Sequence, residues 1–205
     1  MLLLQLFVIG WSLQTIATQT AETGPCPHVK VVQNFNVEKF MGLWFELSRS
    51  LPNTYEPGTE CVTYNYTVDS YDFIRIVARQ FSSETRIESQ YIGNATIDVE
   101  SCAHMKPCGK MKVAYLRPDG TTIIGPLWVL AIDYNSFAVL WSCTEHNNGL
   151  AHSRRAWVIS KMPHPPDSYI EGAQNVLAAD NITDIEFERT PQHTFCSEYY
   201  RNMQE

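Results

Sequence analysis

The chain has 205 residues, of which 44% are hydrophobic and 18% charged, and its formal net charge at pH 7 is −7. A chain with this balance can bury one ordinary core and lies outside the disordered class. The acidic balance argues against nucleic acid and anionic membrane surfaces as partners, because both are bound through clustered lysines and arginines. Composition therefore predicts one globular domain and names no partner.

Residues 1–21 have the pattern of a secretory signal peptide. An apolar stretch from Leu2 to Ile9 is followed by small residues, and we expect cleavage between Ala17 and Ala21. This stretch is too short to span a membrane, and no later segment reaches the roughly 20 apolar residues that a spanning helix needs. We therefore expect a secreted, extracellular protein with no transmembrane segment, whose single domain comprises residues 22–205.

The most informative stretch is residues 36–46, just after this leader and just before a run of short strands. Gly42 stands two residues before Trp44 and permits a tight turn at the start of a strand. Val37, Phe40 and Trp44 supply the bulk that closes one end of a barrel. The segment predicts a barrel with a closed base, which is a cup.

Eight strands are predicted between residues 43 and 160. Alternating patterns between turn signals such as Asn147-Asn148-Gly149 place them at residues 43–50, 61–68, 72–81, 88–97, 109–117, 123–132, 136–143 and 152–160. Because the connections are short, we expect each strand to form a hairpin with the next one along the chain.

A helix and a short final strand are predicted after the eight strands. Asp167 can cap the helix, and Asn181 fits its end. Apolar residues recur at helical spacing at Ile170, Ala173, Val176 and Leu177. We expect this helix to pack outside the barrel, and Ile185 and Phe187 to alternate in the final strand.

Three Asn-x-Ser/Thr sequons, at Asn65, Asn94 and Asn181, predict N-glycosylation. A glycan must face water and strand side chains alternate, so the sequons and the charged residues of nearby strands define which positions point inward. The inward residues that we expect to contact a ligand are Tyr64, Tyr66, Ile76, Ala78, Tyr91, Met111, Val113 and Tyr115. This lining is typical of a pocket for a small lipophilic molecule; the alternative is that the same residues fill a solid core.

Three blocks of the sequence resemble the signatures of the lipocalin family, in the family's order. Phe40, Gly42 and Trp44 fit the first block, residues 131–134 resemble the second, and residues 156–159 with Lys161 and Pro163 resemble the third. Residues 61–67 and 127–143 are most similar to the branch of apolipoprotein D, bilin-binding protein and Lazarillo. The resemblance implies an all-β fold: an eight-stranded antiparallel up-and-down β-barrel with one C-terminal α-helix packed outside and a short final strand.

Six cysteines behind a leader predict three disulfides, and about 15 pairings exist for such a set. The family resemblance implies two of the pairs, Cys26–Cys143 and Cys61–Cys196, and leaves Cys102 and Cys108 as a local pair. A metal site at Cys102, His104 and Cys108 is the weaker interpretation, because thiols oxidise outside the cell.

The third block carries Lys161 where the family usually has an arginine over the signature tryptophan, here Trp44. A lysine can make a cation–π contact but lacks the planar guanidinium fork. If Lys161 lies at the closed end, parity places Trp157 higher inside the cup and Arg155 at its mouth. We hypothesise that Trp157 stacks on the ligand and that Arg155 binds a ligand carboxylate; the alternative is that Arg155 is solvated at the rim.

The resemblance implies a carrier of a fatty acid, steroid, retinoid or similar lipid, with no cofactor other than this non-covalent ligand. The alternatives are a pigment carrier for a biliverdin-type tetrapyrrole or a carotenoid, and an extracellular interaction glycoprotein with little ligand. A cell-surface receptor is a further candidate partner. An enzyme is not expected, because an even set of paired cysteines leaves no free thiol and because Glu46 and Asp133 are expected at turns or at the rim.

Overall fold

The computed structural model describes residues 21–51, 58–69, 73–116 and 120–201. The predicted signal peptide, except for its last residue, and the predicted strand ends at residues 72 and 117 lie outside this part of the chain. The division into a signal peptide and a domain that begins at residue 22 therefore stays a prediction.

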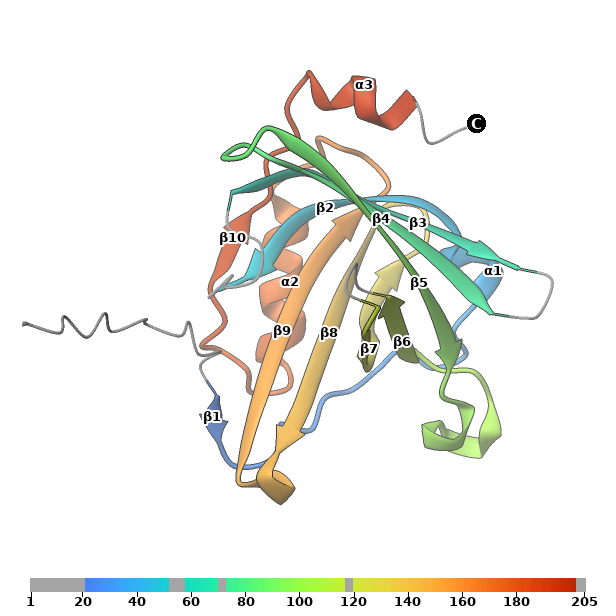
Figure 1. Cartoon of the computed structure of the whole chain (residues 1–205). Coiled ribbons are helices and arrows are strands. Elements are labelled where there is room, and N and C mark those ends of the chain that lie inside the picture. Colours follow the sequence, from blue (N-terminus) through green and yellow to red (C-terminus); the bar gives the residue numbers. More distant parts are fainter. Residues whose placement is uncertain (1–20, 52–57, 70–72, 117–119, 202–205) are drawn as a thin grey trace, which may run out of the picture.

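One antiparallel sheet of ten strands dominates the described residues. The strands are β1 (Glu22–Thr23), β2 (Gly42–Ser50), β3 (Thr59–Val68), β4 (Ile74–Ser82), β5 (Ile87–Ile97), β6 (Lys110–Leu116), β7 (Thr122–Asp133), β8 (Phe137–His146), β9 (Ala151–Ser160) and β10 (Phe187–Arg189). Strands β2 to β9 pair in chain order, and β9 pairs back with β2, which closes an eight-stranded barrel (Figure 1). The predicted fold class and hairpin order are confirmed.

The two remaining strands lie outside this ring. β1 pairs with the start of β9, and β10 pairs with the end of β2. β10 begins at Phe187, two residues later than the predicted final strand. Among the eight barrel strands, the largest difference from prediction is at β8, which continues three residues further, to His146.

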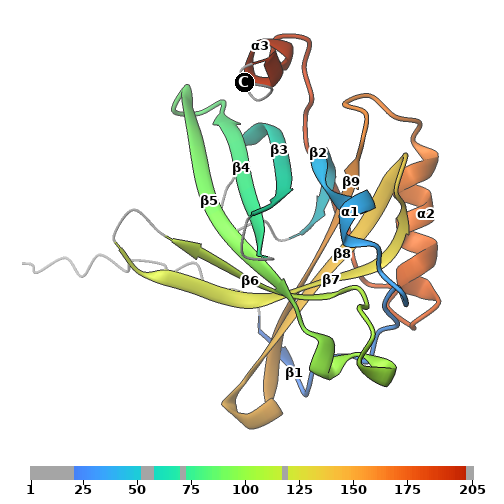
Figure 2. The same ribbon diagram turned by 90° about the vertical axis from the view of Figure 1, so that its right-hand side faces the viewer.

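Helices occupy the outside and the closed end of the barrel. They are α1 (Val37–Phe40), α2 (Ser168–Ala178) and α3 (Cys196–Arg201), with short 3-10 turns η1 (Val99–Ser101), η2 (Ala103–Met105) and η3 (Asn147–Gly149). As predicted, α2 packs on the outer face, beside β7, β8 and β9, and buries Ala173 and Leu177 there (Figure 2). Asn181 follows its end with a left-handed backbone, at φ 61°.

The prediction that Asp167 caps α2 through its side chain is wrong. Asp167 occupies the position before the first helical residue, but its carboxylate makes no capping hydrogen bond. Instead its Oδ1 lies 2.8 Å from Nη2 of Arg189, on β10. An exposed ion pair to a neighbouring strand has taken the place of the local hydrogen bond that the sequence pattern suggests.

The core has two large apolar clusters, and a third small one comprises Cys61, Phe81 and Cys196. The inner cluster fills the base of the barrel and includes Phe40, Trp44, Tyr66 and Met111. The outer cluster lies between the barrel wall and α2 and includes Trp141 and the outward residues of β9. All six cysteines are paired, as Cys26–Cys143, Cys61–Cys196 and Cys102–Cys108, and the three predicted disulfides are confirmed.

Candidate functional site

An aromatic plug closes one end of the barrel. Asn36 caps α1 by accepting a hydrogen bond from the Lys39 amide, and α1 carries Phe40 into the base. The Trp44 indole donates from Nε1 to the Phe40 carbonyl at 2.7 Å. Lys161 lies with Nζ 4.0 Å from the centre of the Trp44 ring. The base is therefore sealed by side chains that the first and third sequence blocks supply.

Burial of the inward side chains decreases from the base toward the mouth. Tyr66, Ile76 and Met111 are fully buried. By contrast, the predicted lining residues Tyr64, Ala78, Tyr91, Val113 and Tyr115 are only partly buried. Strand register keeps Tyr64, Ala78 and Tyr91 on one face, since they pair successively across β3, β4 and β5. Because that face points inward, its exposed surface opens into the lumen of the barrel.

Two glycines show how the lumen is filled. Gly125 lies opposite the inward Val113, and a methyl group added there would meet no atom within 4 Å. At Gly93, by contrast, an added methyl group would lie 2.5 Å from the Tyr115 ring. The ring of Tyr115 therefore packs flat across the β5 backbone, while the wall at Gly125 borders open space.

The inward face of β9 carries Trp157 and Arg155 as parity predicts. Trp157 pairs with Leu140 on one side and with Arg49 on the other, and it packs against the inner cluster. Arg155 is partly buried and lies two residues nearer the mouth. Its neighbour Arg154 points outward. The positions agree with the sequence analysis, while the ligand contacts of Trp157 and Arg155 stay predictions.

The predicted glycosylation sites lie on the outer surface. Asn94 and Asn181 are exposed and Asn65 is partly exposed. Asn65 on β3 pairs with Val77 of β4, and Asn94 on β5 pairs with Arg75 of β4. Their occupancy stays a prediction.

A buried ion pair in the barrel wall was missed by sequence reasoning. Glu46 is 1% exposed and Arg49 is 7% exposed, so the prediction that Glu46 lies at a turn or rim is wrong. The pairing of β2 with β9 shifts register between Glu46 and Ser48. This β-bulge inserts one residue and brings two positions three apart onto the same inward face. Alternation alone would have placed Glu46 and Arg49 on opposite faces. Asp133, the other acid considered, ends β7, and its carboxylate accepts hydrogen bonds from the Asn135 amide and the Ser136 hydroxyl in the turn that leads to β8.

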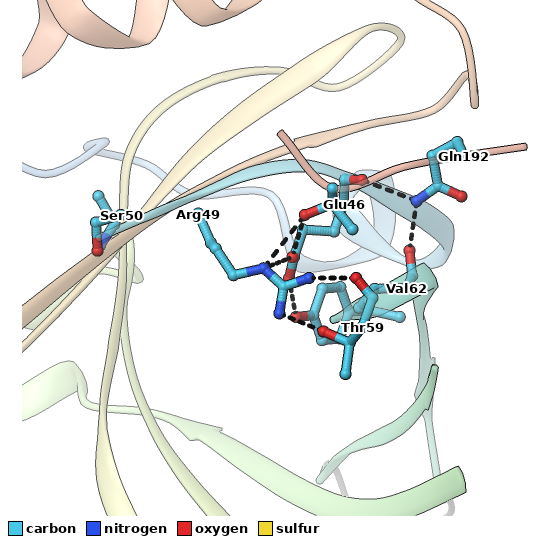
Figure 3. Close-up of polar contacts among 9 residues, drawn as sticks. Glu46, Arg49, Ser50, Thr59, Val62 and Gln192 are labelled. Atoms are coloured by element: carbon cyan, nitrogen blue, oxygen red, sulfur yellow. Dashed lines mark hydrogen bonds and ion pairs between the residues drawn. The ribbon is translucent and has the colours of Figure 1, made fainter. Parts of the chain in front are cut away.

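Glu46 is fully occupied by donors (Figure 3). Its Oε1 lies 2.8 Å from Nε of Arg49 and accepts a hydrogen bond from the Thr190 hydroxyl at 2.6 Å. Its Oε2 accepts a hydrogen bond from the Tyr64 hydroxyl at 2.5 Å. Burial, reinforced by the neighbouring Glu46 carboxylate, raises the pKa of Tyr64 well above its ordinary value. Tyr64 therefore stays protonated and donates its hydroxyl hydrogen bond to Glu46.

The C-terminal segment, residues 190–201, contacts the same part of the barrel wall as Glu46. Gln192 donates from Nε2 to the Glu46 carbonyl at 2.8 Å and to the Val62 carbonyl at 2.9 Å, and so bridges β2 and β3. Tyr200 donates to Oε1 of Gln192. The Cys61–Cys196 disulfide ties this segment to β3 as well. β2 and β3 pair only as far as Phe45 and Thr63, and Gln192 links the two strands beyond that point. In the sequence, only the predicted disulfide partner of Cys61, Cys196, indicated that the C-terminal segment lies against β3.

Two hollows also occur on the outside of the molecule. One of about 470 Å³ is lined by Lys39 and residues 132–135, and another of about 380 Å³ lies between residues 163–166 and residues 189–192. Neither is lined by the predicted ligand residues. Across the described residues, no three His, Cys, Asp or Glu side chains gather where they could hold a metal ion. No helix in the described part of the chain is long and apolar enough to cross a bilayer.

Comparison with known proteins agrees with this architecture. The model of the lipocalin / cytosolic fatty-acid binding protein family matches residues 95–194. Apolipoprotein D of Oryctolagus cuniculus is 27% identical over 198 residues, which cover 97% of this chain and 98% of the relative. The Lazarillo protein of Schistocerca americana is 23% identical over 180 residues, covering 88% of this chain and 80% of the relative. These matches confirm the predicted resemblance to the lipocalin family.

Solved structures of similar proteins show the same fold as this chain. Insecticyanin of the tobacco hornworm Manduca sexta superposes with a TM-score of 0.72 at 24% identity, covering 87% of this chain and 92% of that one. Lobster apocrustacyanin A1 superposes with a TM-score of 0.71 at 19% identity, covering 91% and 99%. The similarity to lipocalins supports the binding of a small ligand and leaves the ligand's identity open.

Proposed function

We propose that this protein is a secreted carrier that binds a small hydrophobic molecule, such as a fatty acid, steroid or retinoid, inside its barrel. The observation that carries the proposal is the partial exposure of inward aromatic and apolar side chains above a sealed aromatic base. Removing apolar ligand surface from water would drive binding, at roughly 25 cal/mol per Å². The polar groups near the mouth would set the ligand's orientation.

A carrier is favoured over an enzyme by the state of the cysteines. All six are held in disulfides, so the chain offers no thiol nucleophile. The names of the relatives agree with the lipid class, since apolipoprotein D is among them and the family description includes fatty-acid binding.

A lumen-filling substitution tests the proposal. Ala78 points inward between Tyr64 and Tyr91, so Ala78→Trp should occupy ligand space and weaken binding of retinol or a fatty acid by about tenfold or more. Val77→Trp, one residue away on the outer face, is the matched control and should bind as the wild type does. Quenching of tryptophan fluorescence during titration measures both. Equal affinities in the two variants would contradict a ligand site in the lumen.

The co-purified ligand decides between the classes of carrier. Native mass spectrometry of protein from its own source should show a bound lipophile. A visible absorption band in the same sample would instead identify a pigment carrier. A barrel that is empty in repeated preparations, and that takes up no lipid on titration, would favour the interaction glycoprotein.

A further inference from the structure

Two polar residues of the lumen wall, Arg49 and Tyr64, donate hydrogen bonds to partners within the wall. Nε of Arg49 contacts Glu46 and, at 3.3 Å, the Thr190 hydroxyl. Nη1 donates to the Thr59 hydroxyl at 2.6 Å, and Nη2 donates to the Thr59 carbonyl at 3.1 Å. The only proton of the Tyr64 hydroxyl goes to Glu46. Each guanidinium nitrogen of Arg49 thus has a partner within the wall, among them Glu46 and Thr59 (Figure 3).

This arrangement restricts what a ligand can bury beside Tyr64. A phenol whose proton is already donated can still accept a hydrogen bond, so it can pair with a ligand hydroxyl. A ligand carboxylate would find the Tyr64 proton already donated and the Arg49 charge already paired with Glu46, whose own negative charge would repel it. A charged group that is buried without partners is strongly disfavoured.

We infer that Glu46 acts as a positioning residue that makes the inner lumen selective for ligands with a neutral buried end, one that is alkyl or carries a hydroxyl, and that it rejects a buried carboxylate. The inference rests on the proposed function and adds to it the chemistry and orientation of the ligand. A fatty acid would enter with its carboxylate at the mouth, beside Arg155, and its other end toward Tyr64.

Strand geometry gives the length of ligand that tests this. Glu46 pairs with Ile159, which lies four residues along β9 from Arg155. At the rise of a strand, this is roughly 13 Å. A straight-chain acid such as dodecanoic acid can therefore place its carboxylate near Arg155 and its last carbon near Tyr64.

The probes are dodecanoic acid, ω-hydroxydodecanoic acid and dodecanedioic acid, which differ only at the buried end. In the wild type, the dioic acid should bind at least about tenfold more weakly than the hydroxy acid, measured by tryptophan quenching at pH 7.4. Tyr64→Phe should weaken the hydroxy acid by about tenfold and leave dodecanoic acid nearly unchanged. Loss of the hydroxyl acceptor explains this difference.

Glu46→Gln gives the sharper result, because it should improve binding of one ligand. The substitution frees the Tyr64 proton and Nε of Arg49, and it leaves the guanidinium charge uncompensated. Affinity for dodecanedioic acid should therefore rise by about tenfold, which general damage to the fold would not produce. Tyr169→Phe, on the outer helix α2, is the control and should keep the wild-type order of affinities.

The outcomes separate this inference from the proposed function. If the three acids bind the wild type equally well, the selectivity is overturned while the carrier function stands. If none of them binds and no lipophile co-purifies, the carrier function fails and the inference fails with it. If Glu46→Gln does not fold, the loss of hydroxyl preference in Tyr64→Phe decides the matter alone.

Discussion

Opposing effects act on the charge of Lys161, which lies over the Trp44 ring. Burial lowers the pKa of its amine to about 8. The ring face of Trp44 and the Met41 carbonyl, which accepts a hydrogen bond from Nζ at 2.9 Å, both favour the charged ammonium. An arginine would satisfy the same two partners, stay charged and stack its planar group on the indole.

We therefore expect Lys161→Arg to stabilise the protein by roughly 0.5–1 kcal/mol at pH 7. Lys161→Met, which keeps the aliphatic contact and loses the charge, should be less stable than Lys161→Arg. Urea unfolding followed by tryptophan fluorescence measures all three proteins. An arginine variant that unfolds at a lower urea concentration than the wild type would contradict the prediction.

Lys161→Arg should also change how the stability of the protein depends on pH. The folded pKa of about 8 lies below the ordinary value of 10.5, so between these values the unfolded chain binds more protons than the folded one. Wild-type stability should therefore gain a contribution that grows as pH rises through this window, while arginine gains none. The advantage of Lys161→Arg should narrow between pH 8 and pH 10, which thermal melts at stepped pH would measure.

Two glycines of the barrel wall should respond oppositely to a methyl group. Gly93→Ala would place Cβ 2.5 Å from the Tyr115 ring and 2.8 Å from the Ala114 carbonyl oxygen, so we expect a loss of about 1–3 kcal/mol. Gly125→Ala meets no neighbour within 4 Å and should be nearly neutral or slightly stabilising. Chemical denaturation of both variants checks the pair, and similar losses at the two sites would show that the lumen is not open at Gly125.

At the scale of elements, a long-range and a local disulfide should contribute different amounts to the free energy of unfolding. Cys61–Cys196 joins residues 135 apart, whereas Cys102–Cys108 joins residues six apart. In the chain-entropy model, removing them should cost about 5 and about 2 kcal/mol. Paired cysteine-to-alanine variants compared by urea unfolding measure this. Equal losses would mean that the C-terminal segment is held mainly by contacts such as those of Gln192.

Most of the barrel could be predicted because each strand obeys a local rule. Alternation across Tyr64, Tyr66 and their neighbours depends only on which side of a strand meets water. The Glu46–Arg49 pair could not be predicted this way, because its geometry depends on an extra residue in β2 whose effect appears only when β9 pairs with it. Asp167 shows the same limit, since its partner Arg189 is distant in sequence.

Tyr64, Ala78 and Tyr91 share one strand face, as alternation predicts, but their contact with a ligand stays a prediction, and their roles depend on contacts between strands. Tyr64 was predicted as a lining residue from alternation alone. That its hydroxyl donates a hydrogen bond to Glu46 follows only from the fold, because two residues 18 positions apart leave no local sequence pattern. A candidate site can thus be listed from sequence, while its polarity toward a ligand cannot.

At the scale of the whole molecule, Arg154 joins the segment before the barrel strands to the segment after them. Its Nε donates to Oε1 of Glu22 on β1 at 2.7 Å, and its Nη2 donates to Asp184, which precedes β10. The hydrogen bond from Arg154 lowers the pKa of the Asp184 carboxyl below its ordinary 3.8. One guanidinium on β9 therefore secures both terminal segments to the barrel.

We expect Asp184→Asn to lower stability at pH 7 by at most about 1 kcal/mol, since the carboxylate is exposed. A depressed folded pKa gives stability that is present above pH 3.8 and lost as pH falls through the folded value. The gap between variant and wild type should therefore close in strong acid. Thermal melts from pH 7 downward measure it, with Glu188→Gln on β10 as the control. A gap that stays constant across this range would contradict the role of the ion pair.

Closure of the barrel has a kinetic consequence for the proposed carrier. β9 pairs back to β2, and the aromatic plug fills the base, so across the described residues entry and exit share one doorway. Molecules that share one narrow doorway cannot pass each other. An occupant must leave before its successor arrives, so adding excess competitor should not hasten its departure. The dissociation rate of the bound molecule would then set the rate of delivery, whatever the concentration of competing lipid.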